Sequence, residues 1–229
     1  MKFGVVIFPG SNCDMDIIYV LDKIMKQEVV KLWHKDTDLQ KVDFIILPGG
    51  FSYGDYLRSG AIAKFSPIMK EIIGFAKSGG FVMGICNGFQ ILTESGLLPG
   101  ALLNNKSHKF ICKNIHLKTM TKDTLITSDY VDQVLKIPIA HAEGRYHADD
   151  ETLLSLVKND QIVFKYADKN GLINDTTNPN GSLLNIAGIC NKERNVFGLM
   201  PHPERAADSE LSNTDGKLLF ESILSKIQS

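Results

Sequence analysis

Short apolar runs alternate with segments of helical periodicity over the first hundred residues. The run at residues 2–8 fits a buried strand, and in the segment after it Ile17, Leu21 and Ile24 repeat at helical spacing. Further strands are predicted at residues 28–33, 42–48 and 80–86, and further helices at residues 66–77, with Ser66 as cap, and 87–96. This alternation predicts an α/β fold, with a doubly wound, mostly parallel sheet flanked by helices.

The second half of the chain has a different pattern. Residues 113–120 and 161–167 alternate with period two, which favours antiparallel strands with one wet face. Residues 196–204 return to a buried strand that ends in a loop, and the segment from Leu218 onward is again helical in pattern. Residues 168–182 are rich in Asn, Asp, Thr and Gly, so we expect a surface loop or a hairpin insert.

Composition narrows the class of protein. The length of 229 residues suits one α/β domain covering residues 1–229, and 25 Lys and Arg against 26 Asp and Glu predict neither nucleic acid nor membrane as partner. The first apolar run is too short for a signal peptide. Four separated cysteines without a C-x-x-C pair indicate reduced thiols in a cytoplasm and no zinc site: Cys13, Cys86, Cys112 and Cys190.

The sequence GICNG around Cys86 fits G-x-C-x-G, the cysteine form of a nucleophile elbow. Such a sharp strand-to-helix turn needs small neighbours, and a thiol at a helix N-terminus faces unpaired N–H groups that favour the thiolate. The alternative is a buried structural cysteine at a glycine-rich turn. Cys13 also follows a strand, but it lacks the glycines and has Asp14 beside it, so it is the weaker candidate. Cys112 and Cys190 are interpreted as core residues.

A cysteine nucleophile needs a base, and the sequence MPHPER offers one. His202 and Glu204 are two residues apart, so in an extended segment the carboxylate can orient the imidazole. A solvated histidine on a surface loop is the alternative interpretation. His141 and His147 lack metal-ligand spacing and are predicted to be packing or rim residues.

A second glycine-rich turn ends the strand at residues 42–48. Gly49 and Gly50 would let the backbone approach a bound group closely, so their N–H groups could stabilise an oxyanion. The turn lacks the Gly-Lys-Ser/Thr ending of a phosphate loop. An ordinary strand-to-helix turn remains the alternative.

Together these motifs resemble class I (triad) glutamine amidotransferases, whose fold is flavodoxin-like. The segments FPGSNCD, GGFSYGDYLRSGA, CNGFQIL, LLPGALLNN, AEGR and MPHPERA span nearly the whole chain, and they resemble the stand-alone glutaminase subunits of phosphoribosylformylglycinamidine synthase. The resemblance implies that Cys86 attacks the side-chain amide of L-glutamine while His202, oriented by Glu204, transfers the proton. It also implies an oxyanion hole from the N–H groups of Gly50 and Asn87, and substrate binding by Gln90.

The resemblance further implies a division of labour in purine biosynthesis. Ammonia would pass through a tunnel to a large synthetase subunit that uses ATP and Mg, joined by a small bridging subunit, while this chain needs no cofactor. Tyr53, Tyr56 and Arg58 are candidates for the docking surface. The chain departs from the pattern at Ala142, where Gly is expected in many relatives, and in the insert at residues 168–182. A different flavodoxin-like cysteine hydrolase and a non-catalytic regulatory module remain open.

Overall fold

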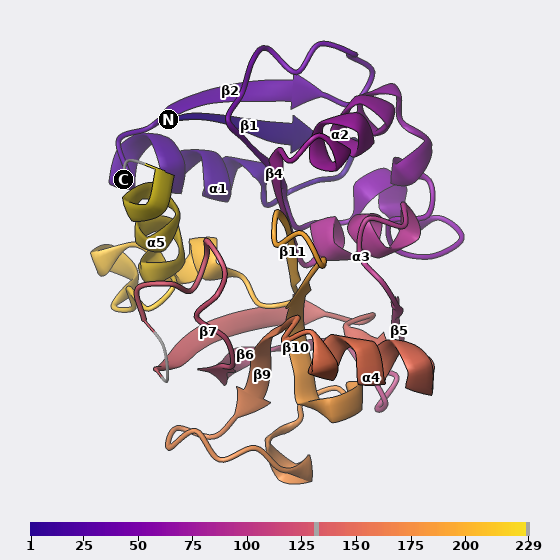
Figure 1. The fold of residues 1–229 in the computed structure, drawn as a ribbon, viewed down its shortest axis with the longest axis vertical. Helices are drawn as coiled ribbons and strands as arrows, with labels where there is room; N and C mark the ends of the chain where they lie inside the picture. Colours follow the sequence, from indigo (N-terminus) through magenta and orange to yellow (C-terminus); the bar gives the residue numbers. More distant parts are fainter. Residues whose placement is uncertain (131–132, 228–229) are drawn as a thin grey trace.

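A computed structural model of the chain describes residues 1–130 and 133–227. Within these residues nine strands form one sheet in the order β2-β1-β3-β4-β11-β10-β9-β6-β7, and β5 and β8 form a separate pair (Figure 1). The strands are β1 (Lys2–Ile7), β2 (Glu28–Trp33), β3 (Phe44–Leu47), β4 (Phe81–Ile85), β5 (Ala101–Leu103), β6 (Ile111–Thr119), β7 (Val134–His141), β8 (Arg145–His147), β9 (Ile162–Ala167), β10 (Ile186–Cys190) and β11 (Val196–Leu199).

Helices lie on both sides of the sheet. In Figure 1, α1 and α5 lie to its left, and α2, α3 and α4 to its right. Their bounds are α1 (Asp14–Tyr19), extended by a π-helical turn at Val20–Ile24, α2 (Pro67–Lys77), α3 (Asn87–Glu94), α4 (Asp150–Lys158) and α5 (Lys217–Ile227). The α/β class and the flanking helices predicted from the sequence are therefore confirmed. Within the described ranges, no helix has the length and apolarity needed to cross a bilayer.

The type of strand pairing changes once along the sheet, from parallel to antiparallel, at β11. From β2 to β11 all pairs are parallel, and the helices α1 and α2 form the crossovers from β1 to β2 and from β3 to β4. From β11 to β7 all pairs are antiparallel, as the period-two segments predict. Because β11 runs parallel to β4, the turns that follow the two strands lie at the same edge of the sheet. This edge is where open α/β sheets bind ligands.

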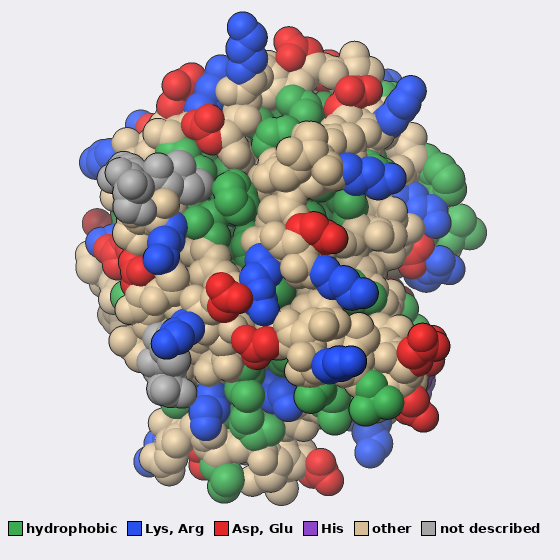
Figure 2. Space-filling view, in the orientation of Figure 1, with side chains coloured by type: hydrophobic (Ala, Val, Ile, Leu, Met, Phe, Trp, Pro, Cys, Tyr) green, Lys and Arg blue, Asp and Glu red, His purple; other side chains and the backbone are tan. Residues whose placement is uncertain are grey.

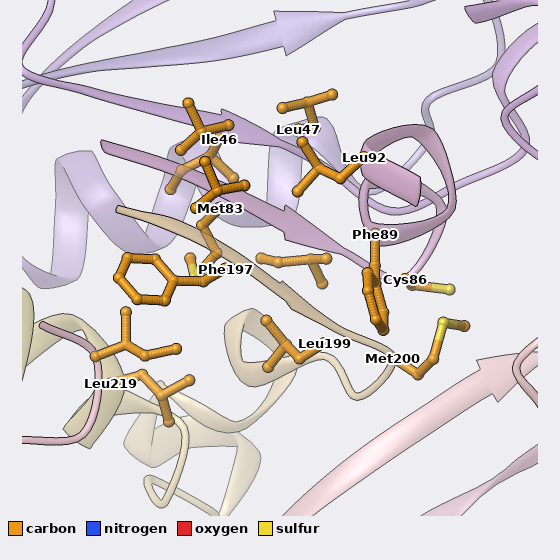
Figure 3. Close-up of a cluster of buried hydrophobic side chains, with 14 of the residues drawn as sticks. Ile46, Leu47, Met83, Cys86, Phe89, Leu92, Phe197, Leu199, Met200 and Leu219 are labelled. Atoms are coloured by element: carbon orange, nitrogen blue, oxygen red, sulfur yellow. The ribbon is translucent and has the colours of Figure 1, made fainter. Parts of the chain in front are cut away.

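The core is densest around the central strands. Figure 3 shows side chains of β3, β4 and β11 packed together, with Cys86 at the edge of the cluster near Phe89 and Met200. On the face shown in Figure 2, acidic and basic side chains are interspersed without a large patch of one sign. That distribution agrees with the near-zero net charge.

Two local predictions need correction, and a third is refined. Ser66 precedes α2 but makes no side-chain cap, and its hydroxyl meets the hydroxyl of Tyr53 at 2.8 Å instead. Cys112 lies on the exposed side of β6, because one face of this antiparallel strand is wet, whereas Cys190 is buried as expected. The segment 168–182 connects β9 to its neighbour β10, as a hairpin insert would. It is not only a surface loop, because Asn180 is buried and its amide donates to the carbonyl oxygen of Gly144 at 2.8 Å.

Candidate active site

Cys86 alone connects β4, which ends at Ile85, to α3, which begins at Asn87. Its φ of +51° and ψ of −104° are rare for a residue with a side chain and cost of order 1–3 kcal/mol. The glycines on either side are sterically required. A Cβ at Gly88 would lie 2.0 Å from the carbonyl oxygen of Leu47, and one at Gly84 would lie 2.5 Å from the backbone of Gly88. The sharp turn places the thiol at the carboxyl edge of the sheet, as the sequence predicts.

The neighbouring strand β11 delivers His202 and Glu204 to the same edge. The backbone N–H of His202 donates to the carbonyl oxygen of Pro138 at 2.9 Å, which ties the segment to β7. His202 Nδ1 and Glu204 Oε1 lie 2.6 Å apart, and both residues are buried. An ionised carboxylate only accepts hydrogen bonds, so Nδ1 carries the proton and Nε2 is directed to other partners. The interpretation of His202 as a solvated surface histidine is thus wrong.

The environment of His202 favours the charged imidazolium. Burial by itself lowers the pKa of His202, but the Glu204 carboxylate and the thiol of Cys86 outweigh that effect and raise the pKa well above its ordinary value. Nε2 has no hydrogen-bond partner of good geometry among the described residues. The Cys86 thiol instead points to the carbonyl oxygen of Ala140 at 3.8 Å. Loose geometry of this kind between base and nucleophile is common in enzymes without bound substrate.

A cavity of about 80 Å³ opens beside the thiol. It is lined by Gly50, Phe51, Asp55, Ser59, Cys86, Gln90, Ala140, His141, Ala142 and Glu143. Two of the predicted site residues, Gly50 and Gln90, therefore share one chamber with Cys86. No described hydrogen bond uses the N–H of Gly50, and Asn87 begins α3, where helical N–H groups lack intrahelical partners. Both groups are available for an oxyanion.

Gln90 is fixed by its neighbours. Its Oε1 accepts from Asn87 Nδ2 at 2.9 Å, and its Nε2 donates to the carbonyl oxygen of Glu143 at 2.5 Å. The amide keeps one further N–H and one lone pair free for a ligand. Gln90 therefore couples the helix after the thiol to the loop after β7.

The thiol of Cys13 is closer to the site than the sequence suggests. Its ligand atom and those of His202 and Glu204 all lie within 4.8 Å of one another, a set of donors that could hold a metal ion. However, Arg205 Nη2 lies 3.2 Å from Cys13 Sγ, and Arg205 Nε is paired with Asp16 at 3.1 Å. A guanidinium bound to the sulfur opposes a second cation there. We therefore assign no metal to this cluster.

Four polar wall residues of the cavity were not among the predicted site residues. His141, expected as packing or rim, is buried in the wall, and burial together with nearby His202 lowers its pKa to about 4. Asp55, Ser59 and Glu143 complete that side. Asp55 and Ser59 lie in the motif GGFSYGDYLRSGA, and Glu143 lies in AEGR. The sequence therefore contained these residues, but it did not show that the folded loops bring them to one cavity. His147 is exposed on β8.

The three docking candidates differ in exposure. Tyr56 is 75% exposed, while Tyr53 is half-buried, with its hydroxyl 2.6 Å from His34 Nδ1. Arg58 is held by Glu94 in two hydrogen bonds of 2.5 and 2.8 Å. Of the three, only Tyr56 presents a largely unengaged side chain to a partner.

The chain is similar to known proteins over nearly its whole length. Residues 1–219 match the CobB/CobQ-like glutamine amidotransferase domain family. Proteins called phosphoribosylformylglycinamidine synthase subunit PurQ are 58% identical in Koribacter versatilis, covering 98% of this chain and 97% of the relative, and 53% identical in Acaryochloris marina, covering 99% and 97%. The solved structure of PurLQS from Thermotoga maritima superposes with a TM-score of 0.86 at 45% identity, covering 99% of this chain and 98% of that one.

Proposed function

This chain belongs to the PurQ family of glutamine amidotransferase subunits, and we propose that it hydrolyses L-glutamine to glutamate and ammonia for phosphoribosylformylglycinamidine synthase. One observation carries the proposal. The strained turn at Cys86 and the His202–Glu204 pair follow two neighbouring parallel strands and meet beside a small cavity. A nucleophile, a base and a residue that orients the base are the parts that acyl transfer requires.

In the first half-reaction the thiolate of Cys86 attacks the amide carbon of glutamine. The electron pair moves to the carbonyl oxygen, where the N–H groups of Gly50 and Asn87 would each contribute about 3 kcal/mol to the transition state. His202, protonated on both nitrogens, then donates the Nε2 proton to the leaving nitrogen. The carbon–nitrogen bond breaks, ammonia departs, and a glutamyl thioester remains on Cys86.

In the second half-reaction neutral His202 accepts a proton from water, whose oxygen attacks the thioester carbon. The carbon–sulfur bond breaks, glutamate leaves, and the sulfur returns as thiolate beside the imidazolium. Glu204 stays ionised throughout and stabilises the positive ring, as its 2.6 Å contact with Nδ1 allows. His202 would therefore act as the general acid in the first half-reaction and as the general base in the second.

The ammonia is the product that a partner would use. The names of the relatives place them in a synthase assembly, and the T. maritima structure is of PurLQS. We propose that the chain acts as a single domain, docks on a large synthetase subunit together with a small bridging subunit, and delivers ammonia through a tunnel. The partner would use ATP and Mg to convert formylglycinamide ribonucleotide to its amidine in the cytoplasm.

Labelling with an electrophilic glutamine analogue tests the nucleophile and the substrate class together. We would treat the chain, with and without its synthetase subunit, with 6-diazo-5-oxo-L-norleucine and map the adduct by peptide mass spectrometry. An adduct confined to Cys86 is expected, with protection by L-glutamine. The exposed thiol of Cys112 is an internal control for unspecific alkylation.

The other outcomes discriminate between functions. Labelling of Cys13 would mean that the other thiol is the nucleophile. Absence of any adduct, even in the complex, would favour a non-catalytic module that kept the shell of an amidotransferase. Labelling that glutamine does not prevent would favour a cysteine hydrolase with another substrate.

A further inference from the structure

Two carboxyl groups, those of Asp55 and Glu143, line the small cavity together with Cys86 and Gln90. No ion pair in residues 1–130 and 133–227 includes either of them. The guanidinium of Arg58 interacts with Glu143 through space, but its two hydrogen bonds are made to Glu94. The wall of the cavity therefore carries negative charge that no described side chain neutralises by a direct ion pair.

Ser59 holds the two carboxyl groups in place. Its N–H donates to Glu143 Oε2 at 3.1 Å, and its side chain forms a hydrogen bond with the Asp55 carboxylate. Asp55 also lies 3.5 Å from Asn87 Nδ2, through its Oδ1. Ser59 and Asn87, which lie on two separate segments, therefore fix the positions of the two carboxyl groups.

The electrostatics of Asp55 favour a cationic ligand beside its carboxyl group. Burial raises its pKa, Ser59 lowers it, and Glu143 raises it again, with a net value of about 6. Two like charges that share a partly buried wall destabilise each other. A positive group between them would remove that cost.

His141 supplies an independent sign that this cavity receives a hydrogen-bond donor. Asn105 Nδ2 donates to two carbonyl oxygens, those of Lys109 at 2.9 Å and of His141 at 2.8 Å, which fixes the orientation of the amide. Asn105 Oδ1 therefore faces His141 Nδ1 at 3.0 Å, so Nδ1 carries the proton and Nε2 is an acceptor. That Nε2 is buried without a partner, and His141 lines the cavity.

We propose that Asp55 and Glu143 form the subsite that binds the α-ammonium group of the amino-acid substrate. The inference rests on the proposed glutaminase function and adds the groups that select an α-amino acid over a simple amide. An ammonium group offers three N–H donors and one positive charge, which two carboxylates satisfy. The amide end of the same molecule then lies toward Cys86, and Gln90, bonded to Asn87 and to Glu143, links the two ends of the cavity.

Steady-state kinetics of the complex with the synthetase subunit test this subsite. Asp55→Asn and Glu143→Gln keep hydrogen-bond acceptors for Ser59 but remove the charge. Each is expected to raise KM for L-glutamine about 10- to 100-fold, the range of a lost charged hydrogen bond, with kcat changed less than about threefold. Glu151→Gln, an exposed acid outside the cavity, is the matched control and leaves KM unchanged.

A second substrate separates charge recognition from general damage to the site. Glutaramate, which is glutamine without its α-amino group, should be hydrolysed by the wild type with a kcat/KM far below that for glutamine. The preference is the kcat/KM for glutamine divided by the kcat/KM for glutaramate. It should fall about tenfold or more in the two variants, because they lose the charge that distinguishes the two substrates. A merely structural role would lower both activities in parallel.

The pH dependence supplies a further check. KM for glutamine should rise as the pH falls through about 6 in the wild type, because protonation of Asp55 removes the negative partner of the ammonium group. Of the charged groups nearby, Glu143 faces Asp55 directly, and Arg58 remains paired with Glu94. Cys86 and His141 line the same cavity. In Asp55→Asn this step should disappear, whereas a step due to His141, whose pKa is about 4, would persist at lower pH.

The outcomes separate this inference from the function beneath it. If the wild-type complex hydrolyses glutamine and both variants keep its KM and the same preference over glutaramate, the ammonium subsite is wrong and the glutaminase function stands. If the wild-type complex hydrolyses no glutamine, both proposals are overturned. A melting temperature near that of the wild type for each folded variant confirms that the kinetics report the site.

Discussion

Two thiols contact one imidazole, yet the structure prepares only one of them for chemistry. Cys86 and Cys13 both lie in strand-to-helix turns at the carboxyl edge of the sheet, and both are close enough to His202 to raise its pKa. Cys86 has a strained backbone with φ of +51°, whereas Cys13 has a relaxed φ of −100°. Proximity to His202 therefore does not distinguish the two thiols.

The surroundings of the two sulfur atoms differ more than their positions. Cys86 faces a cavity with free N–H groups at Gly50 and Asn87, where a substrate carbonyl can be bound. Cys13 faces Arg205, whose guanidinium fills the space beside the sulfur and places a positive charge there. A thiol becomes a nucleophile where the fold also provides room and an oxyanion site. Cys13 instead has the contacts of a residue that supports the wall behind His202.

The largest expected effect is that of Cys86→Ala. Removing the nucleophile should lower kcat for glutamine hydrolysis by about 10⁴-fold or more, with the fold retained, because no other group can form the thioester. Ammonia release by the complex, measured with glutamine in excess, gives the rate. Retained hydrolysis would overturn the contrast between the two thiols at once.

Glu204→Gln should have an intermediate effect. The amide can still accept from Nδ1, but its lost charge lowers the pKa of His202, so less imidazolium is present to pair with the thiolate. We expect kcat to fall about 100-fold, and His202→Ala to cost more because proton transfer itself is lost. The rate of Cys86 alkylation by iodoacetamide at pH 7 should fall in parallel. Equal losses in the two variants would contradict the roles assigned to them.

The smallest expected effect is that of Cys13→Ala. Arg205 keeps its pair with Asp16, so kcat should fall by less than about tenfold. The free energy of unfolding should drop by about 1 kcal/mol for the lost buried contacts, as chemical denaturation would measure. A loss of activity as large as that of Cys86→Ala would assign Cys13 a direct part in the reaction.

The fold was predictable where strands are buried on both faces. Such strands give continuous apolar runs, so β1, β3 and β4 follow from the pattern alone. Strand β7 was not predicted, since Pro138 interrupts its pattern. The proline is tolerated because β7 is an edge strand. Helix α4 was not predicted, although Asp149 caps it by accepting from the N–H of Thr152.

The candidate site divides in a similar way. The sharp turn at Cys86 and the contact between His202 and Glu204 were predictable because glycine spacing and an i, i+2 pair are local features of the sequence. The pairing of Cys13 with Arg205, and of Asp55 with Glu143, depends on segments far apart in the sequence that meet only in the folded chain. Local sequence patterns do not predict such contacts, because the contacts depend on how several loops pack together.

The position of β11 between β4 and β10 has a consequence for biogenesis. More than a hundred residues separate Cys86 from His202, and β11 must enter the middle of the sheet before the imidazole reaches the thiol. At roughly 5–20 residues per second, a ribosome needs about 5 to 20 s to synthesise that interval. During this time a nascent chain exposes the unpaired edge of β4 but has no base with which to activate its thiol. The thiol and the imidazole assigned to the proposed reaction can therefore meet only after β11 has been synthesised.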